Sequence, residues 1–186
     1  MQLLAFAASL RRESWNRKLL ACAVELALAG GATVDVAEFR EFDMPLYDAD
    51  LQAREGFPPG AEELARRAHA ADGLLIASPE YNYSLPGTLK NAIDWVSRIR
   101  PIPFRGKHGM LLSASNGVYG GIRGLWQLRI PLEGVGVLLY PEMFALSLAG
   151  QMFDDRGALK DPQVRERLEK MVKGYLDLAW RLSGGR

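Results

Sequence analysis

The sequence predicts an α/β fold with one doubly wound, five-stranded parallel sheet and helices on both of its faces. Short apolar runs alternate with longer segments of helical periodicity, which is the pattern of consecutive β-α-β units. The expected strands are Leu3–Ala8, Thr33–Ala37, Gly73–Ser78, Gly109–Ala114 and Val135–Leu146. The expected helices are Asn16–Ala29, Ala61–Ala71, Leu85–Arg98, Gly121–Glu133 and Pro162–Leu182. A five-stranded sheet of this kind predicts the strand order 2-1-3-4-5.

Local features support these elements. Leu19 and Ala23 lie one turn apart on the face of the first helix that should meet the sheet, and Gly30-Gly31 suits the left-handed backbone that ends many helices. The segment from about Phe39 to Pro59 mixes Asp, Pro, Gly and aromatic residues, and is expected to be a long functional loop. Pro131 should kink or shorten the fourth helix, because proline lacks the N–H that a helix interior needs.

Size and composition narrow the function classes. The 186 residues fit one domain, residues 1–186, with a sizeable core. The formal net charge of +1 disfavours nucleic acid or an anionic membrane as the main partner. Cys22 is the only cysteine, and His69 and His108 are far apart, so neither a disulfide within the chain nor a zinc catalyst is expected. The apolar first residues are too short for a membrane span, and we expect a cytoplasmic protein.

The first candidate site is the segment from Ser9 to Asn16, between the first strand and the first helix. Backbone N–H groups at the start of a helix are unpaired and attract anions. Ser9, Ser14 and Asn16 add neutral donors, and Arg11 adds a charged one. This set suits a monophosphate better than a pyrophosphate. The alternative is that Ser14 or Asn16 only caps the helix and the arginines are solvated; this segment alone does not decide between the two.

The most informative segment runs from Ser78 to Trp95, after the third strand. Open α/β sheets bind ligands at the carboxyl ends of their strands. Pro79, Glu80, Tyr81 and Asn82 have no evident structural purpose at this position. Tyrosine rings offer stacking surface and an amide can hydrogen-bond a ring edge, which favours a flat aromatic ligand. The alternative is that the tyrosines only pack on a neighbouring subunit.

The helix after this loop is expected to begin with Ser84 as its N-cap and Pro86 in its first turn. A third loop, Ser115 to Gly121, follows the fourth strand and offers hydrogen-bonding groups and glycines that let backbone approach a ligand. The three loops together predict one pocket, with a phosphate at the first loop and an aromatic ring at the others. Neither histidine lies in these loops, which disfavours a general-base hydrolase and favours a cofactor that carries its own reactivity.

These segments resemble the NADPH-dependent FMN reductase family, most closely its chromate/quinone reductase branch. The resemblance rests on Ser9-Leu10-Arg11-x-x-Ser14-x-Asn16, Met44-Pro45-Leu46-Tyr47-Asp48, Pro79-Glu80-Tyr81-Asn82-Tyr83-Ser84 through Asp94-Trp95, and Gly117-x-x-Gly120-Gly121. It implies a flavodoxin-like fold, bound FMN, and NADPH or NADH as transient electron donor. It further implies reduction of quinones, azo dyes, flavins or oxyanions such as chromate, in a homodimer or homotetramer with the flavin near a subunit boundary.

The resemblance also assigns cofactor contacts by matching position. It implies that the phosphate is held by Ser9, Arg11, Ser14 and Asn16, that Pro79, Glu80, Tyr81 and Asn82 border the isoalloxazine, and that Ser115, Asn116 and Gly117 lie on its pyrimidine side. Tyr83, Ser84 and Gly120 complete the predicted cofactor-binding set.

No side chain is expected to be catalytic, because flavin N5 would accept and donate the hydride. We expect a ping-pong reaction in which the small-molecule acceptor takes the place of NAD(P)H. The alternatives are a flavodoxin-like electron carrier and a flavin-bound redox sensor, both without NAD(P)H turnover. The near-zero net charge disfavours a carrier, since electron carriers tend to be strongly acidic. The sequence leaves the acceptor and the choice between NADPH and NADH open.

Overall fold

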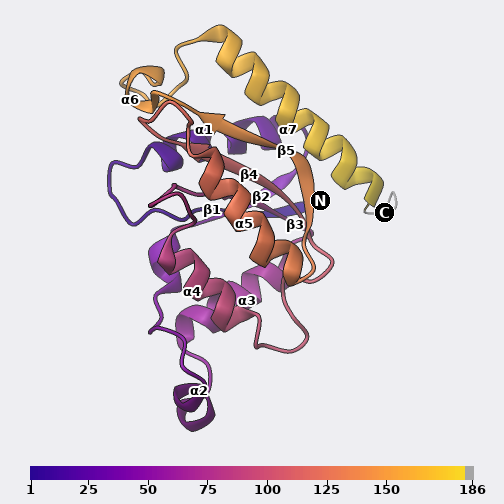
Figure 1. Ribbon diagram of the computed structural model, residues 1–186. Coiled ribbons are helices and arrows are strands. Elements are labelled where there is room, and N and C mark those ends of the chain that lie inside the picture. Colours follow the sequence, from indigo (N-terminus) through magenta and orange to yellow (C-terminus); the bar gives the residue numbers. More distant parts are fainter. Residues whose placement is uncertain (183–186) are drawn as a thin grey trace.

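The computed structural model describes residues 1–182 and contains a parallel sheet with the strand order β2-β1-β3-β4-β5 (Figure 1). The strands are β1 (Gln2–Ala7), β2 (Thr33–Ala37), β3 (Gly73–Ala77), β4 (His108–Ala114) and β5 (Leu138–Leu146). Each neighbouring pair is parallel. The predicted fold class and strand order are therefore confirmed.

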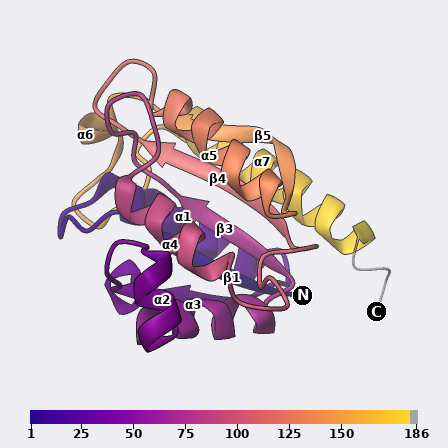
Figure 2. The same cartoon turned by 60° about the horizontal axis from the view of Figure 1, so that its bottom comes forward.

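Helices cover both faces of the sheet, as predicted (Figures 1 and 2). They are α1 (Trp15–Ala29), α2 (Ala49–Glu55), α3 (Pro59–Ala70), α4 (Gly87–Val96), α5 (Ile122–Gly134), α6 (Ala149–Met152) and α7 (Pro162–Leu182), with a short 3-10 helix, η1 (Phe39–Phe42). Buried side chains of α1 and α7 pack on one face of the sheet, and those of α3, α4 and α5 pack on the other. Apolar residues on both faces of β1, β3 and β4 join these two cores.

The prediction of a long loop between about Phe39 and Pro59 is partly wrong, because this segment contains η1 and α2. Phe39 stacks on Phe6 of β1, with ring centroids 5.7 Å apart, and this contact folds η1 onto the core. Asp48 starts α2 by accepting a hydrogen bond from the N–H of Asp50 at 2.8 Å. The segment therefore has local order of its own.

Two expected boundaries near Pro131 also shift. Helix α5 continues to Gly134, so Pro131 does not shorten it. The last turn keeps a bond from the N–H of Val135 to the carbonyl of Pro131 at 3.1 Å, because proline loses only its donor. Gly136 then adopts a positive φ of 96°, and β5 begins at Leu138 rather than at Val135.

The topology brings three loops to one edge of the sheet. Ala7 of β1 pairs with Ala77 of β3, and Ala77 pairs with Leu112 of β4, so the three strands end side by side. The loops after β1, β3 and β4 therefore leave the sheet at the same carboxyl edge, with β3 between β1 and β4. This is the edge at which open α/β sheets bind ligands.

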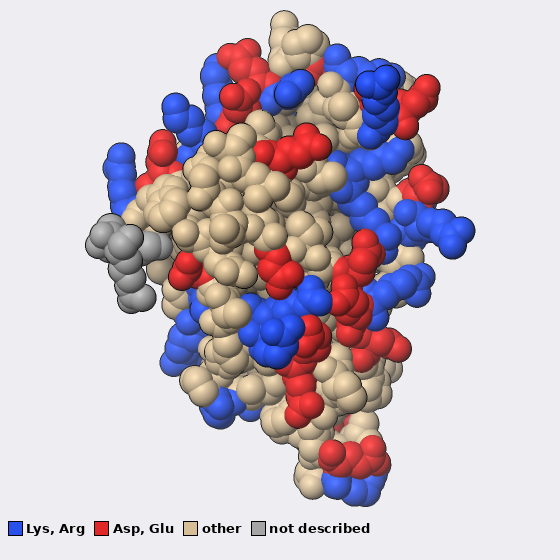
Figure 3. Space-filling model, turned by 180° about the vertical axis from the view of Figure 1, so that it is seen from behind, with Lys and Arg blue, Asp and Glu red and all other residues tan. Residues whose placement is uncertain are grey.

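Charged side chains of both signs are mixed on the surface of the protein. On the face seen in Figure 3, Lys and Arg side chains alternate with Asp and Glu side chains around a broad uncharged area. Some of the charged side chains form ion pairs, and Arg67 contacts the carboxylates of Glu63, Asp35 and Glu41. Within residues 1–182, no helix is both long enough and apolar enough to cross a membrane.

Candidate functional site

The loop between β1 and α1 presents a run of free backbone donors. In the described chain, none of the backbone N–H groups of residues 10–16 donates a hydrogen bond to protein. Ser14 is the N-cap of α1 by backbone position, but its side chain makes no capping hydrogen bond. The positive end of the helix therefore faces this loop with its donors open, an arrangement that binds an anion.

Side chains add to this group of donors. Ser9 and Ser14 are buried, yet neither hydroxyl has a hydrogen-bond partner in the part of the chain that the structure describes. Arg11 is exposed and likewise makes no ion pair with residues 1–182. Among residues 1–182, neither hydroxyl oxygen belongs to the buried unpartnered atoms, so both reach solvent and can donate to a ligand with several acceptor oxygens. A phosphate monoester such as that of FMN has this chemistry.

Asn16 has a structural role that the sequence prediction did not include. Its Nδ2 donates to the carbonyl of Ala114 and its Oδ1 accepts from the N–H of Ala114, both at 3.0 Å. The side chain is buried and thus fastens the first turn of α1 to the last residue of β4. A contact between Asn16 and phosphate stays a prediction.

The loop after β3 forms a tight turn that replaces the expected helix start. Tyr81 and Ser84 exchange backbone hydrogen bonds at 2.9 and 3.0 Å. Because Ser84 is committed to this turn, the prediction that it caps the next helix is wrong; Pro86 occupies the N-cap position of α4. Asn82 and Tyr83, between the paired residues, both have positive φ angles, 49° and 68°.

The two tyrosines of this turn face solvent, with Tyr81 51% and Tyr83 68% exposed. An exposed ring on a rigid turn is available for stacking against a flat ligand. Pro79 directs the chain from the end of β3 into this turn, since its ring restricts the backbone. The turn therefore has the features expected of a rim around an aromatic ligand.

The carboxylate of Glu80 is bound by residues at the start of α5. Its Oε1 accepts from Nε of Arg123 at 2.8 Å, and its Oε2 accepts from the N–H of Gly124 at 3.1 Å. Burial opposes ionisation of Glu80, but the hydrogen bonds from Arg123 and Gly124 outweigh it, and the pKa of the carboxyl lies below its ordinary value. Glu80 is therefore an ionised cap of α5, a function that the sequence prediction missed.

The loop after β4 is shaped by its own polar side chains. The hydroxyl of Ser115 accepts from the N–H of Gly117 at 3.2 Å, and Oδ1 of Asn116 accepts from the N–H of Gly150 at 2.8 Å. Gly120 has a φ of 61°, and a Cβ there would lie 2.8 Å from the carbonyl carbon of Leu146. The loop lies so close to β5 here that only glycine fits this position.

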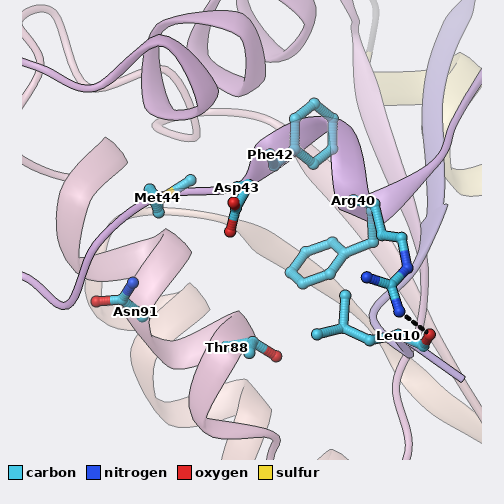
Figure 4. Close-up of a pocket in the computed structure, with 8 residues that line it drawn as sticks. Leu10, Arg40, Phe42, Asp43, Met44, Thr88 and Asn91 are labelled. Atoms are coloured by element: carbon cyan, nitrogen blue, oxygen red, sulfur yellow. Dashed lines mark hydrogen bonds between the residues drawn. The ribbon is translucent and has the colours of Figure 1, made fainter.

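A small cavity of about 150 Å³ adjoins the first loop. Figure 4 shows Arg40 from η1 donating to the carbonyl of Leu10 at 2.7 Å, with Thr88 and Asn91 of α4 across the cavity. This volume is below the usual range for a whole ligand, about 300 Å³ and above. The cavity has room for part of a ligand held at the sheet edge.

The described residues contain no cluster of three or more His, Cys, Asp or Glu side chains that could hold a metal ion. The predicted site residues all lie at the carboxyl edge, in the three loops or, for Asn16, in the first turn of α1. Arg123 was missed, because it lies 43 residues from Glu80 and nothing in the local sequence indicates their pairing.

Comparison with known proteins identifies the family of this chain. Residues 1–151 match the family model for NADPH-dependent FMN reductase. The chain is 39% identical to an NAD(P)H-dependent FMN reductase of Pseudomonas aeruginosa over 186 residues, covering 99% of this chain and 98% of the relative. It is 43% identical to a quinone reductase of Escherichia coli over 132 residues, covering 69% of this chain and 68% of the relative.

Solved structures support the same assignment. The flavoenzyme NAD(P)H:(acceptor) oxidoreductase FerB from Paracoccus denitrificans aligns with a TM-score of 0.84 at 28% identity, covering 97% of both chains. The family match spans most of the chain, and the first relative is aligned over nearly its whole length. The chain therefore belongs to the NADPH-dependent FMN reductase family and is a flavin-dependent oxidoreductase.

Proposed function

We propose that this protein oxidises NADPH or NADH and passes the electrons, through FMN held at the carboxyl edge of the sheet, to quinones and other flat acceptors. The observation that carries the proposal is the run of unpaired N–H groups at residues 10–16, with the free hydroxyls of Ser9 and Ser14 in the described chain. Family membership and the names of the relatives support the same activity.

In this proposal each loop has one task. The loop after β1 binds the phosphate through its backbone N–H groups, Ser9, Ser14 and Arg11. The turn after β3, from Tyr81 to Ser84, borders the isoalloxazine and presents stacking surface to it and to the acceptor. The loop after β4, from Ser115 to Gly120, brings backbone and polar groups to the pyrimidine side.

In this proposal the protein orients the bound FMN and surrounds its ring with hydrogen-bond donors. FMN, when bound, supplies the group that accepts a hydride from NAD(P)H and returns it to the second substrate in a ping-pong sequence. Backbone donors of the loops after β3 and β4 stabilise negative charge on a bound ring. No acid or base among the side chains is needed for this chemistry.

Azo dyes, flavins and oxyanions such as chromate are further acceptors in this proposal. The exposed rings of Tyr81 and Tyr83 support a broad choice, because stacking on an open rim selects for flatness rather than for a particular functional group. We place the protein in the cytoplasm, where NADPH and NADH are available.

A homodimer or homotetramer is part of the proposal. Trp126 and Ile130 lie one turn apart on α5 and are 55% and 66% exposed. Two large apolar side chains on one helix face favour contact with a second subunit. Size-exclusion chromatography with light scattering measures the subunit number directly, and a monomer at micromolar concentration would contradict this part.

The activity is tested on the purified protein reconstituted with FMN. Without oxygen, NADPH or NADH should bleach the visible absorbance of the flavin, and a quinone should restore it over repeated cycles. A protein that binds no FMN would refute the proposal. Full occupancy by FMN with no bleaching would instead indicate an electron carrier or sensor.

A further inference from the structure

The backbone of the turn after β3 needs support that its own sequence does not supply. Asn82 and Tyr83 have φ angles of 49° and 68°, in the left-handed region. Asparagine tolerates this region, but for tyrosine the Cβ crowds the backbone and the conformation is unfavourable. The two hydrogen bonds between Tyr81 and Ser84 close the turn but do not remove the steric cost at Tyr83, so further contacts from the surrounding structure favour this conformation.

Arg123, the second residue of α5, supplies such contacts. The guanidinium carbon of Arg123 lies 4.2 Å from the ring centroid of Tyr83 and 4.8 Å from that of Tyr119. Both distances are within the range of a cation–π interaction. The guanidinium thus contacts one ring of the turn after β3 and one ring of the loop after β4, and joins two of the three loops of the site.

The position of Arg123 is itself fixed. Its Nε and Nη2 contact Oε1 of Glu80 at 2.8 and 2.5 Å, and the Glu80 side chain is only 9% exposed. The other oxygen of Glu80 is held by the N–H of Gly124. A Cβ on Gly124 would lie 3.0 Å from the Cα of Glu80, so a glycine here lets the two segments approach closely.

We propose that Arg123 is a positioning residue, which holds Tyr83 in its left-handed conformation and so keeps the rim of the flavin site formed. The link to flavin rests on the proposed function, whereas the link between Arg123 and the turn rests on contacts within the chain. Arg123 stacks on Tyr83 and need not touch the cofactor, so it acts through the tyrosine.

The test is a double-mutant cycle that combines Arg123→Gln with Tyr83→Gly. Glycine adopts the left-handed region without cost, so a turn with glycine at this position needs no support from Arg123. Titration of apo-protein with FMN, followed by flavin fluorescence, should show about tenfold weaker binding for Arg123→Gln when Tyr83 is present. The same substitution should change binding by less than about twofold in the Tyr83→Gly background. Equal weakening in both backgrounds, or none in either, would overturn the proposal.

A comparison of Tyr83→Ala with Tyr83→Gly separates backbone conformation from loss of the ring. Both variants lack the ring, but alanine keeps the steric conflict at positive φ. The proposal expects the glycine variant to bind FMN more tightly than the alanine variant, and the opposite order would contradict it. Arg129→Gln is the matched control, because Arg129 is also on α5 but pairs with Glu133 and the carbonyl of Tyr140.

The same cycle measured by urea unfolding needs no flavin. Arg123→Gln also removes the ion pair with Glu80, so it should lower the midpoint of unfolding in both backgrounds, and by more when Tyr83 is present than in the Tyr83→Gly background. A wild-type protein that fails to bind FMN would refute the proposed function. The urea-unfolding measurements would then still decide whether Arg123 supports the turn. Wild-type turnover combined with additive effects in the cycle would refute the role of Arg123 alone.

Discussion

Asn16 of α1 and Ala114 of β4 exchange two hydrogen bonds, each 3.0 Å long and buried. The amide side chain pairs with the backbone as a neighbouring strand would, and it extends β4 by one pair of bonds. Because Asn16 follows the first loop and Ala114 precedes the third, this contact sets the spacing between the predicted phosphate and pyrimidine sides of the site.

Asn16→Ala should therefore destabilise the protein and loosen the site together. Loss of the side chain leaves the N–H and carbonyl of Ala114 unsatisfied, which costs about 2–4 kcal/mol of the free energy of unfolding. Urea unfolding measures this loss. Asn91→Ala is the matched control and should cost less, because the Asn91 side chain, which donates to the carbonyl of Pro45 and accepts from the N–H of Tyr47, is less buried. Equal costs would contradict a special role for Asn16.

Gly120→Ala should disrupt the third loop. Alanine there meets the unfavourable positive φ of 61° and places its Cβ 2.8 Å from the backbone of Leu146. Gly31→Ala is the control, since Gly31 has a φ of 85° but no atom within 4 Å of an added Cβ. Both variants lose about 1–2 kcal/mol to backbone strain, and only Gly120→Ala carries the added cost of the clash. Thermal unfolding of the two should separate them by several degrees.

His108 should make stability depend on pH. Nδ1 of His108 and the hydroxyl of Tyr175 share a hydrogen bond at 2.8 Å, the hydroxyl also contacts the carbonyl of Leu74 at 3.3 Å, and Nε2 is buried without a partner in the described chain. Burial lowers the pKa of His108 below its ordinary value of about 6.5, with a smaller opposing effect from Asp72.

The folded state thus favours neutral His108. Its stabilising effect is present above the unfolded pKa, near 6.5, and is lost as pH falls below about that value. Urea unfolding at about pH 7.5 and about pH 5.5 should show this loss in the wild type and a smaller loss in His108→Gln. His69→Gln, the other histidine, should retain the wild-type dependence. An unchanged dependence in His108→Gln would show that other groups cause it.

Ser14→Glu should weaken phosphate binding by repulsion. The carboxylate would lie at the start of α1, where the N–H groups of residues 10–16 are open to an anion. A like charge beside the phosphate should weaken FMN binding by about tenfold or more at low salt. Riboflavin, which lacks the phosphate, is the control ligand, and its affinity should change much less. Equal weakening of both ligands would mean that the substitution distorts the loop instead.

The sequence predicted the sheet because its strands are short apolar runs separated by amphipathic helices, a pattern that depends only on local burial. It also located the three loops, since loops that follow neighbouring parallel strands share an edge. The helix start was misplaced because Ser84 pairs with Tyr81, and local capping preferences do not reveal that competition. Arg123 and the second role of Asn16 depend on partners 43 and 98 residues away, which no local pattern indicates.

The central claim is that the open donors at residues 10–16 hold the phosphate of FMN. The most direct measurement is the affinity of apo-protein for FMN and for riboflavin, determined by fluorescence titration under the same conditions. The account predicts that FMN binds about a hundredfold more tightly or better, because several charge-assisted hydrogen bonds of about 1–2 kcal/mol each are lost with the phosphate. Equal affinity for the two flavins would contradict it.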